Sequence, residues 1–131
     1  LNSSAKPAPL AASDANPEKG IVTRRGRKLI FDDDAVRLII ETPAGKRFVL
    51  DEEEGSIVVE DENGNRLSFD GDGIQFETDA DIQIKASGDL TLEGNNVRIQ
   101  AGAELKAEGS AGAELSAGGI TTVKGSLVKI N

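Results

Sequence analysis

The sequence contains no Cys, Met, Trp, Tyr or His, and its only aromatic residues are four Phe. Without Cys and His the chain has no thiol nucleophile, no disulfide and no zinc site of ordinary composition. The scarcity of aromatic residues also excludes a large core built on aromatic side chains. We therefore expect an aliphatic interior, no metal site and no cofactor.

Long apolar runs are also missing. No window holds 18 consecutive apolar residues, and no basic and then apolar signal peptide opens the chain. The absence of Met, with Leu at position 1, predicts a segment of a longer protein. The net charge is −8, and residues 32–79 hold fifteen Asp and Glu against four Lys and Arg. Such an acidic surface disfavours nucleic acid as a partner.

The carboxylates do not form a convincing catalytic pattern. They cluster at 32–34, 51–54 and 60–62, beside turn residues and with little apolar sequence nearby. A hydrolase needs two carboxylates whose pKa values burial or partners have pushed apart, so solvated turns are the expected role. The string DGDG at 70–73 lacks the spacing and the closing Glu of a calcium loop. No catalytic residue is predicted, and the chain is not expected to be an enzyme.

The chain divides into three parts. Residues 1–19 contain three of the four prolines with Ala, Ser and Asn, which is typical of a linker or an expression remnant. From residue 20 to 73, short apolar stretches alternate with turn residues, and antiparallel hairpins are expected around Gly26, Gly45 and Gly64. Residues 74–131 form the third part.

Apolar residues recur there in pairs that stand one residue apart, a pattern that begins within the hairpins. Successive pairs start seven to ten residues apart, and from Ile74 onward the step is seven or eight. The pairs are Phe48/Leu50, Ile57/Val59, Leu67/Phe69, Ile74/Phe76, Ile82/Ile84, Leu90/Leu92, Val97/Ile99, Leu105/Ala107, Ala113/Leu115, Thr121/Val123 and Val128/Ile130. Alternation within each pair and frequent Gly between pairs exclude a helix and indicate a repeat of one short strand per eight residues, an octad.

A strand with two inward side chains is poor in apolar surface. Burying two side chains stabilises the fold by less than ordering eight residues costs, so the inward pairs need more apolar surface than one chain offers. A single-chain β-solenoid is one solution, but its coils ordinarily contain three short strands, which suits an octad badly. Three identical chains wound about one axis are the other solution, and this arrangement also removes exposed lateral edges. We favour the second.

The predicted fold is therefore all-β. Antiparallel hairpins precede an intertwined homotrimeric, triple-stranded β-helix, or β-prism, over residues 74–131. The residues expected in the trimer core are Ile74, Phe76, Ile82, Ile84, Leu90, Leu92, Val97, Ile99, Leu105, Ala113, Leu115 and Val123. Whether ions lie on the threefold axis cannot be read from the sequence.

In three features the sequence resembles the VgrG proteins of type VI secretion and the tail spikes of contractile phages, which are the central spikes of contractile injection systems. Residues 16–34, NPEKGIVTRRGRKLIFDDD, look like the passage that follows a small OB-fold barrel in those proteins. The octads over 74–131 are the second feature, and the ending ITTVKGSLVKIN is similar to blunt spike ends. The basic run at 24–28 is expected to pair with Asp32–Asp34 or to contact that upstream barrel.

The resemblance implies a structural role. It implies a homotrimeric, membrane-piercing spike that is joined upstream to the hub of a baseplate or tail tube and touches the target envelope transiently. It also implies a PAAR-repeat tip protein on the C-terminal end, with Val128, Lys129, Ile130 and Asn131 as its platform. Such a spike would be assembled in the cytoplasm within a contractile particle or phage tail and delivered or secreted on firing.

Two alternatives stay open at this point. One is a single-chain β-solenoid that binds glycans or degrades polysaccharides, although the chain supplies no Tyr or Trp for stacking on sugars. The other is the shaft of a trimeric phage fibre, which shares the architecture of the spike.

Overall fold

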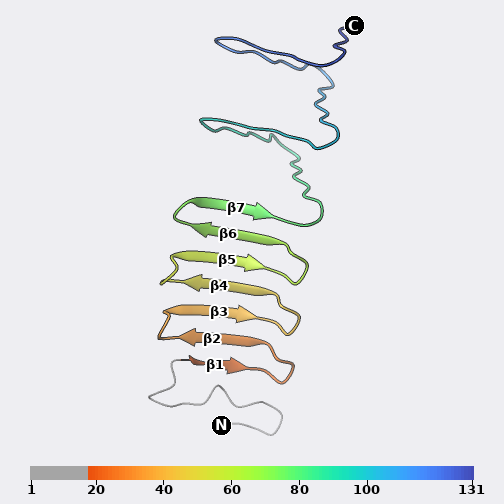
Figure 1. Cartoon of the computed structure of the whole chain (residues 1–131). Coiled ribbons are helices and arrows are strands. Elements are labelled where there is room, and N and C mark those ends of the chain that lie inside the picture. The colour runs from red at the N-terminus through yellow and green to blue at the C-terminus, as the bar shows by residue number, and fades with distance from the viewer. Residues whose placement is uncertain (1–17) are drawn as a thin grey trace. The chain divides into compact units, whose positions relative to one another are not determined.

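The computed structural model describes residues 18–131. Within this range the chain forms seven five-residue strands and no helix (Figure 1), which confirms the all-β prediction. The strands are β1 (Glu18–Val22), β2 (Lys28–Asp32), β3 (Arg37–Glu41), β4 (Arg47–Asp51), β5 (Ser56–Glu60), β6 (Arg66–Asp70) and β7 (Gly73–Glu77). The linker predicted for residues 1–19 lies, up to residue 17, outside the described residues.

The seven strands form one antiparallel sheet in which each strand pairs with the next along the chain. The three predicted hairpins are present as β1–β2, β3–β4 and β5–β6. Their turns contain Gly26, Gly45 and Gly64 at φ values of 79°, 105° and 85°. Only glycine adopts such angles without steric cost, which is why these short turn sequences could be located in advance.

One face of the sheet, called here the apolar face, carries two rows of apolar side chains. The register places Phe48 opposite Val59 and Leu50 opposite Ile57, and the same alignment continues from strand to strand. The rows consist of Ile21, Leu29, Ile40, Phe48, Val59, Leu67 and Phe76, and of Phe31, Leu38, Leu50, Ile57, Phe69 and Ile74. Most of these side chains are exposed, because no second layer covers them among the described residues of this unit.

The opposite face has a narrow central row between charged neighbours. Ile39 and Val49 lie opposite each other there, and at 7% and 9% exposure they are the buried hydrophobic residues of the described range. Beside them runs a row that alternates in charge from β2 to β7, consisting of Lys28, Glu41, Arg47, Glu60, Arg66 and Glu77. Ion pairs of 3.2 to 3.7 Å join members of this row. Long charged side chains can shield apolar neighbours in this way.

Residues 87–131 form a second unit. Its backbone is extended between bends at 87–88, 95–96, 102–103, 110–111, 118–119 and 126–127, so that a bend recurs every seven or eight residues. Each of these bends contains a glycine or directly follows one. Every residue from 81 to 131 is exposed, and this range makes no backbone–backbone hydrogen bond with any residue of 18–131.

Candidate interaction surfaces

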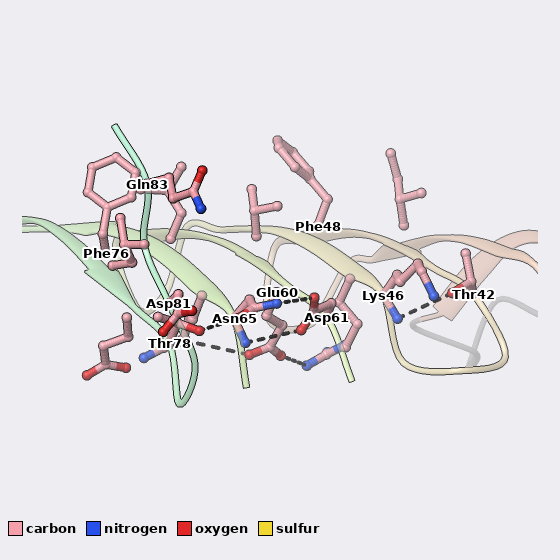
Figure 2. Close-up of a pocket in the computed structure, with 17 residues that line it drawn as sticks. Thr42, Lys46, Phe48, Glu60, Asp61, Asn65, Phe76, Thr78, Asp81 and Gln83 are labelled. Carbon is pink, nitrogen blue, oxygen red and sulfur yellow. Dashed lines mark hydrogen bonds and ion pairs between the residues drawn. The ribbon is translucent and has the colours of Figure 1, made fainter. Parts of the chain in front are cut away.

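A shallow groove of about 850 Å³ lies over one row of the apolar face. Its apolar lining comes from five consecutive strands and from Ile82 beyond β7, the strand residues being Ile40, Phe48, Val59, Leu67 and Phe76. Figure 2 shows Phe48 and Phe76 projecting from the same side of the sheet. A groove lined along its length by aliphatic and aromatic side chains fits an apolar partner surface better than a small polar substrate.

Polar groups at the margin of this groove are bonded to one another. Asp61 accepts hydrogen bonds from the backbone N–H of Asn63 at 2.8 Å and from the side-chain amide of Asn65 at 2.7 Å. Thr78 Oγ1 in turn donates to Asn65 Oδ1 at 2.5 Å. The bond from the Asn65 side chain is the main cause that lowers the pKa of Asp61. A carboxyl with a lowered pKa stays ionised at neutral pH and makes a poor general acid.

A second groove, of about 610 Å³, lies over the other apolar row. Its apolar lining comes from Phe31, Leu38, Leu50, Ile57 and Phe69 of the sheet and from Val36 in the turn after β2. The two grooves together follow most of both rows, from β3 to β7 over the first and from β2 to β6 over the second.

Asp32 borders the second groove and is buried, with 7% exposure. Its Oδ2 accepts a hydrogen bond from Arg37 Nη2 at 2.7 Å, while Oδ1 accepts from the backbone N–H of Asp34 and Ala35, each at 3.2 Å. The Arg37 bond first, and the Ala35 amide second, lower the pKa of this carboxyl against the opposing effect of burial. The arrangement closes the turn between β2 and β3 and is structural in character.

The basic run at 24–28 does not pair with Asp32–Asp34 as one of the two expectations had it. Lys28 lies 3.6 Å from Glu41 because the β2–β3 register places them opposite each other. Asp32 is taken by Arg37, and Asp33 lies 3.7 Å from Lys19. Cross-strand register, which the sequence pattern did not include, decides these partners.

Two further acidic residues bind backbone groups in turns. Asp51 caps the backbone N–H of Glu54 at 2.9 Å, and Asp70 caps that of Asp72 at 2.8 Å in the DGDG string. Within residues 18–131 there is no group of three or more His, Cys, Asp or Glu placed to hold a metal ion. No helix of the same range could cross a membrane.

The residues predicted for the trimer core are exposed in the single chain. Ile74 and Phe76, in β7, belong to the apolar face of the sheet, at 62% and 72% exposure. Those beyond β7 lie on extended backbone, and their large members range from 56% for Leu90 to 79% for Leu115. The set outside the sheet is Ile82, Ile84, Leu90, Leu92, Val97, Ile99, Leu105, Ala113, Leu115 and Val123. The chain itself therefore brings none of these ten side chains into a core.

The four residues predicted for the tip platform are exposed at the end of the second unit. Val128 is 48% exposed and Ile130 is 89% exposed, with Lys129 and Asn131 beside them in sequence.

Sequence reasoning missed two features of the sheet. The apolar face extends back to Ile21 and Leu29, whereas the series of apolar pairs predicted from the sequence begins at Phe48/Leu50. The alternation in KLIFD and RLIIE was the available signal for this extension. The buried Asp32–Arg37 pair had no such signal, because Asp32 is one of three identical residues in the sequence.

Comparison with models of known protein families and with curated proteins finds no match for this chain.

Proposed function

We propose that the chain is a non-enzymatic, membrane-piercing spike segment of a contractile injection system or phage tail, that it acts as a homotrimer, and that its C-terminal end carries a PAAR-type tip protein. The observation that carries the proposal is the incomplete strand structure of residues 81–131. These residues have extended backbone, exposed apolar side chains and no backbone hydrogen bonds of their own.

Once buried in an assembly, the backbone of this segment would need hydrogen-bond partners from other copies of the chain. In folded proteins nearly all buried N–H and C=O groups are hydrogen-bonded, and extended segments achieve this by pairing with other strands. A single-chain solenoid would supply those partners from its own successive coils. Residues 81–131 contain no such pairing, which favours strands contributed by further copies of the chain.

The side chains of the segment support the same conclusion. Leu90 and Leu92, on either side of Thr91, project to one side of an extended strand, and they are 56% and 70% exposed. Contiguous exposed apolar surface on this scale marks an interaction site. Because the same spacing recurs from bend to bend, each octad presents such a pair, and three copies would turn these pairs toward a common axis.

A mechanical role follows from the proposed assembly. Three intertwined chains would make a rod with dense hydrogen bonding between copies, and threaded chains resist unfolding kinetically. The pKa values of Asp32, Asp61 and Glu62 are lowered by their bonding partners, which makes each of these three carboxyls a poor general acid. The acidic exterior would keep the rod soluble within a cytoplasmic particle before it is fired.

Sedimentation of the full chain at micromolar concentration tests the assembly. The expected mass is that of three chains, and the trimer is expected to resist sodium dodecyl sulfate until it is boiled. A monomer mass with well-folded spectra would overturn the proposal and favour the single-chain solenoid.

A pull-down with PAAR-repeat proteins tests the role of the C-terminal end. The full chain is expected to retain the tip protein, and a chain truncated before Ser126 is expected to remain trimeric and lose it. If the full chain is trimeric and binds no PAAR-repeat protein, the tip assignment fails and the fibre shaft becomes the better assignment.

A further inference from the structure

The two sides of the seven-stranded sheet on which its turns lie differ in charge. Because the chain reverses at the end of every strand, its turns alternate between the two sides of the sheet (Figure 1). Turns 23–27, 42–46 and 61–65 lie on one side, which we call the basic edge. Turns 33–36, 52–55 and 71–72 lie on the other, which we call the acidic edge.

The basic edge carries four cations and two anions. These residues are Arg24, Arg25, Arg27, Lys46, Asp61 and Glu62. Glu62 is paired with Lys46 at 2.6 Å, and Asp61 is held by Asn63 and Asn65. Arg24, Arg25 and Arg27 form no ion pair with any residue in 18–131. Asp79 also approaches this edge, beside Gly64 in its last turn. The uncompensated positive charge of this edge therefore lies at the first turn.

The acidic edge carries six anions and no cation. These residues are Asp33, Asp34, Glu52, Glu53, Glu54 and Asp72. Asp33 has a distant and exposed partner in Lys19, 3.7 Å away. The side chains of the other five form no ion pair within the described residues. The sheet thus presents unpaired charges of opposite sign on its two sides.

We propose that the sheet is a docking surface for further copies of this chain, with the apolar faces turned inward and the basic edge of one copy against the acidic edge of the next. This inference rests on the proposed trimer and adds the direction and order of the copies. An arrangement in which all copies run the same way around one axis brings unlike edges together. An antiparallel pair would bring like edges together and create repulsion between equal charges.

The strand order also places the opposite charges of neighbouring copies at nearly the same level along the axis of the proposed trimer. Turn 23–27 follows β1 and turn 33–36 follows β2, so they are offset along the sheet by one strand spacing, about 4.8 Å. An arginine side chain spans such an offset easily. In a ring without axial shift, Arg24 and Arg25 of one copy therefore come within reach of Asp33 and Asp34 of the next. Attraction is concentrated at this end of the sheet, since Lys46 is already paired with Glu62.

The apolar face alone would not fix this arrangement. Its two rows are similar in character, so burial of Phe48 or Leu50 stabilises parallel and antiparallel packing alike. The edges supply the direction, because charge complementarity contributes specificity by penalising wrong partners. In this way the sheet would align the three chains before the octads beyond it pair.

Charge reversal in the full chain tests the proposal. Arg24→Glu with Arg25→Glu makes the basic edge acidic, and Asp33→Lys with Asp34→Lys makes the acidic edge basic. Each double variant is expected to lower the fraction of chains recovered as trimer after refolding at low salt by about tenfold. Screening at high salt is expected to restore most of that loss.

The variant with all four reversals is the decisive one. It recreates unlike edges with exchanged signs, so its trimer yield is expected to return to within about threefold of the unmodified chain. Glu104→Lys with Glu114→Lys is the control, since these residues alternate with Leu105 and Leu115 and lie on the outer side of the proposed prism. Equal yields for all variants, or no rescue by the fourfold variant, would overturn the inference while leaving the trimer intact. A monomeric unmodified chain would instead overturn the proposed function.

Cysteine cross-linking gives an independent readout, because the natural sequence has no Cys. Arg25→Cys combined with Asp34→Cys is expected to yield covalent trimers with a short bismaleimide, and neither single variant is expected to cross-link. Covalent dimers from a single variant would show that like edges meet and would overturn the inference.

Discussion

Val36 and Gly55 end two successive turns on the same side of the sheet with nearly the same backbone conformation, φ 50° and 63°. The equivalent position is occupied by a β-branched residue in one turn and by glycine in the other. The Val36 carbonyl also accepts a hydrogen bond from the backbone N–H of Glu52 at 3.1 Å, which links the two turns. The conformation is thus set by the surrounding sheet and not by the preference of Val36.

Val36→Gly is expected to stabilise the sheet. A β-branched residue at positive φ costs about 1–3 kcal/mol, whereas the added freedom of glycine in the unfolded chain costs about 0.5–1 kcal/mol. The net gain should be about 1 kcal/mol, visible as a higher unfolding midpoint in urea at fixed protein concentration. Gly55→Ala is the matched reverse change: a Cβ added at Gly55 meets no atom of the chain within 4 Å, so a loss of stability would report backbone strain. A decrease in stability for Val36→Gly would contradict this account and indicate contacts of the Val36 side chain between copies.

Asp32 should make the stability of the sheet depend on acid. Its folded-state pKa lies below the ordinary value of 3.8, chiefly because of the Arg37 hydrogen bond. Such a group stabilises the fold above its unfolded pKa, and the contribution is lost as the pH falls through the lower, folded value. The free energy of unfolding is therefore expected to decline below about pH 4.

Asp32→Asn should lower stability near pH 7 and flatten this acid decline. Asp89→Asn is the control, since the Asp89 side chain forms no hydrogen bond or ion pair within the described residues and lies beyond the strands of the sheet. Urea titrations from pH 7 to pH 2.5 compare the variants. Equal slopes for Asp32→Asn and the unmodified chain would show that the pair does not contribute. Asp61 and Glu62 also have lowered pKa values. Their protonation is therefore expected to leave some acid dependence of the free energy of unfolding in the Asp32→Asn variant.

The hairpins could be predicted because their information is local. Gly26, Gly45 and Gly64 stand where a turn requires positive φ, and alternating residues on either side identify the strands. Ion-pair partners were predicted less well. Lys28 faces Glu41 because of the cross-strand register, and a shift of one residue would have moved it to the other face. Burial of Asp32 likewise depends on the folded turn and leaves no trace in composition.

For the octads, the repeat could be predicted from the sequence but the contacts of its side chains could not. Their spacing is evident in the sequence, and the backbone bends at matching intervals, but a single chain does not contain the contacts that would bury Ile82 or Val97. A periodic pattern identifies which side chains share a face. It does not supply the surface that covers this face, which in the proposed trimer comes from the other two copies.

Leu90→Asp is expected to prevent trimer formation. In the proposed prism, residue 90 of all three copies meets near the axis, and three carboxylates there would be buried without partners. Thr91→Asp is the matched control, because the neighbouring residue points to the opposite face of an extended strand. Sedimentation at micromolar concentration should give a monomer or aggregate for the first variant and a trimer for the second. Equal behaviour of the two would contradict the assignment of Leu90 to the core.

The bends of the second unit are of two kinds, and this difference is testable. A Cβ added at Gly109 would collide with the backbone carbonyl oxygen of Gly112, whereas one added at Gly102 would meet no atom of the chain within 4 Å. A clash with backbone cannot be relieved by a side-chain rotation, so the bend itself must open. Gly109→Ala is therefore expected to weaken the trimer by about 1–3 kcal/mol per chain, while Gly102→Ala is expected to change it little. The temperature at which the trimer band dissociates in sodium dodecyl sulfate provides the measurement. If Gly102→Ala proves the more damaging change, another copy must pack against Gly102, and the space around each bend would then be set by contacts between chains.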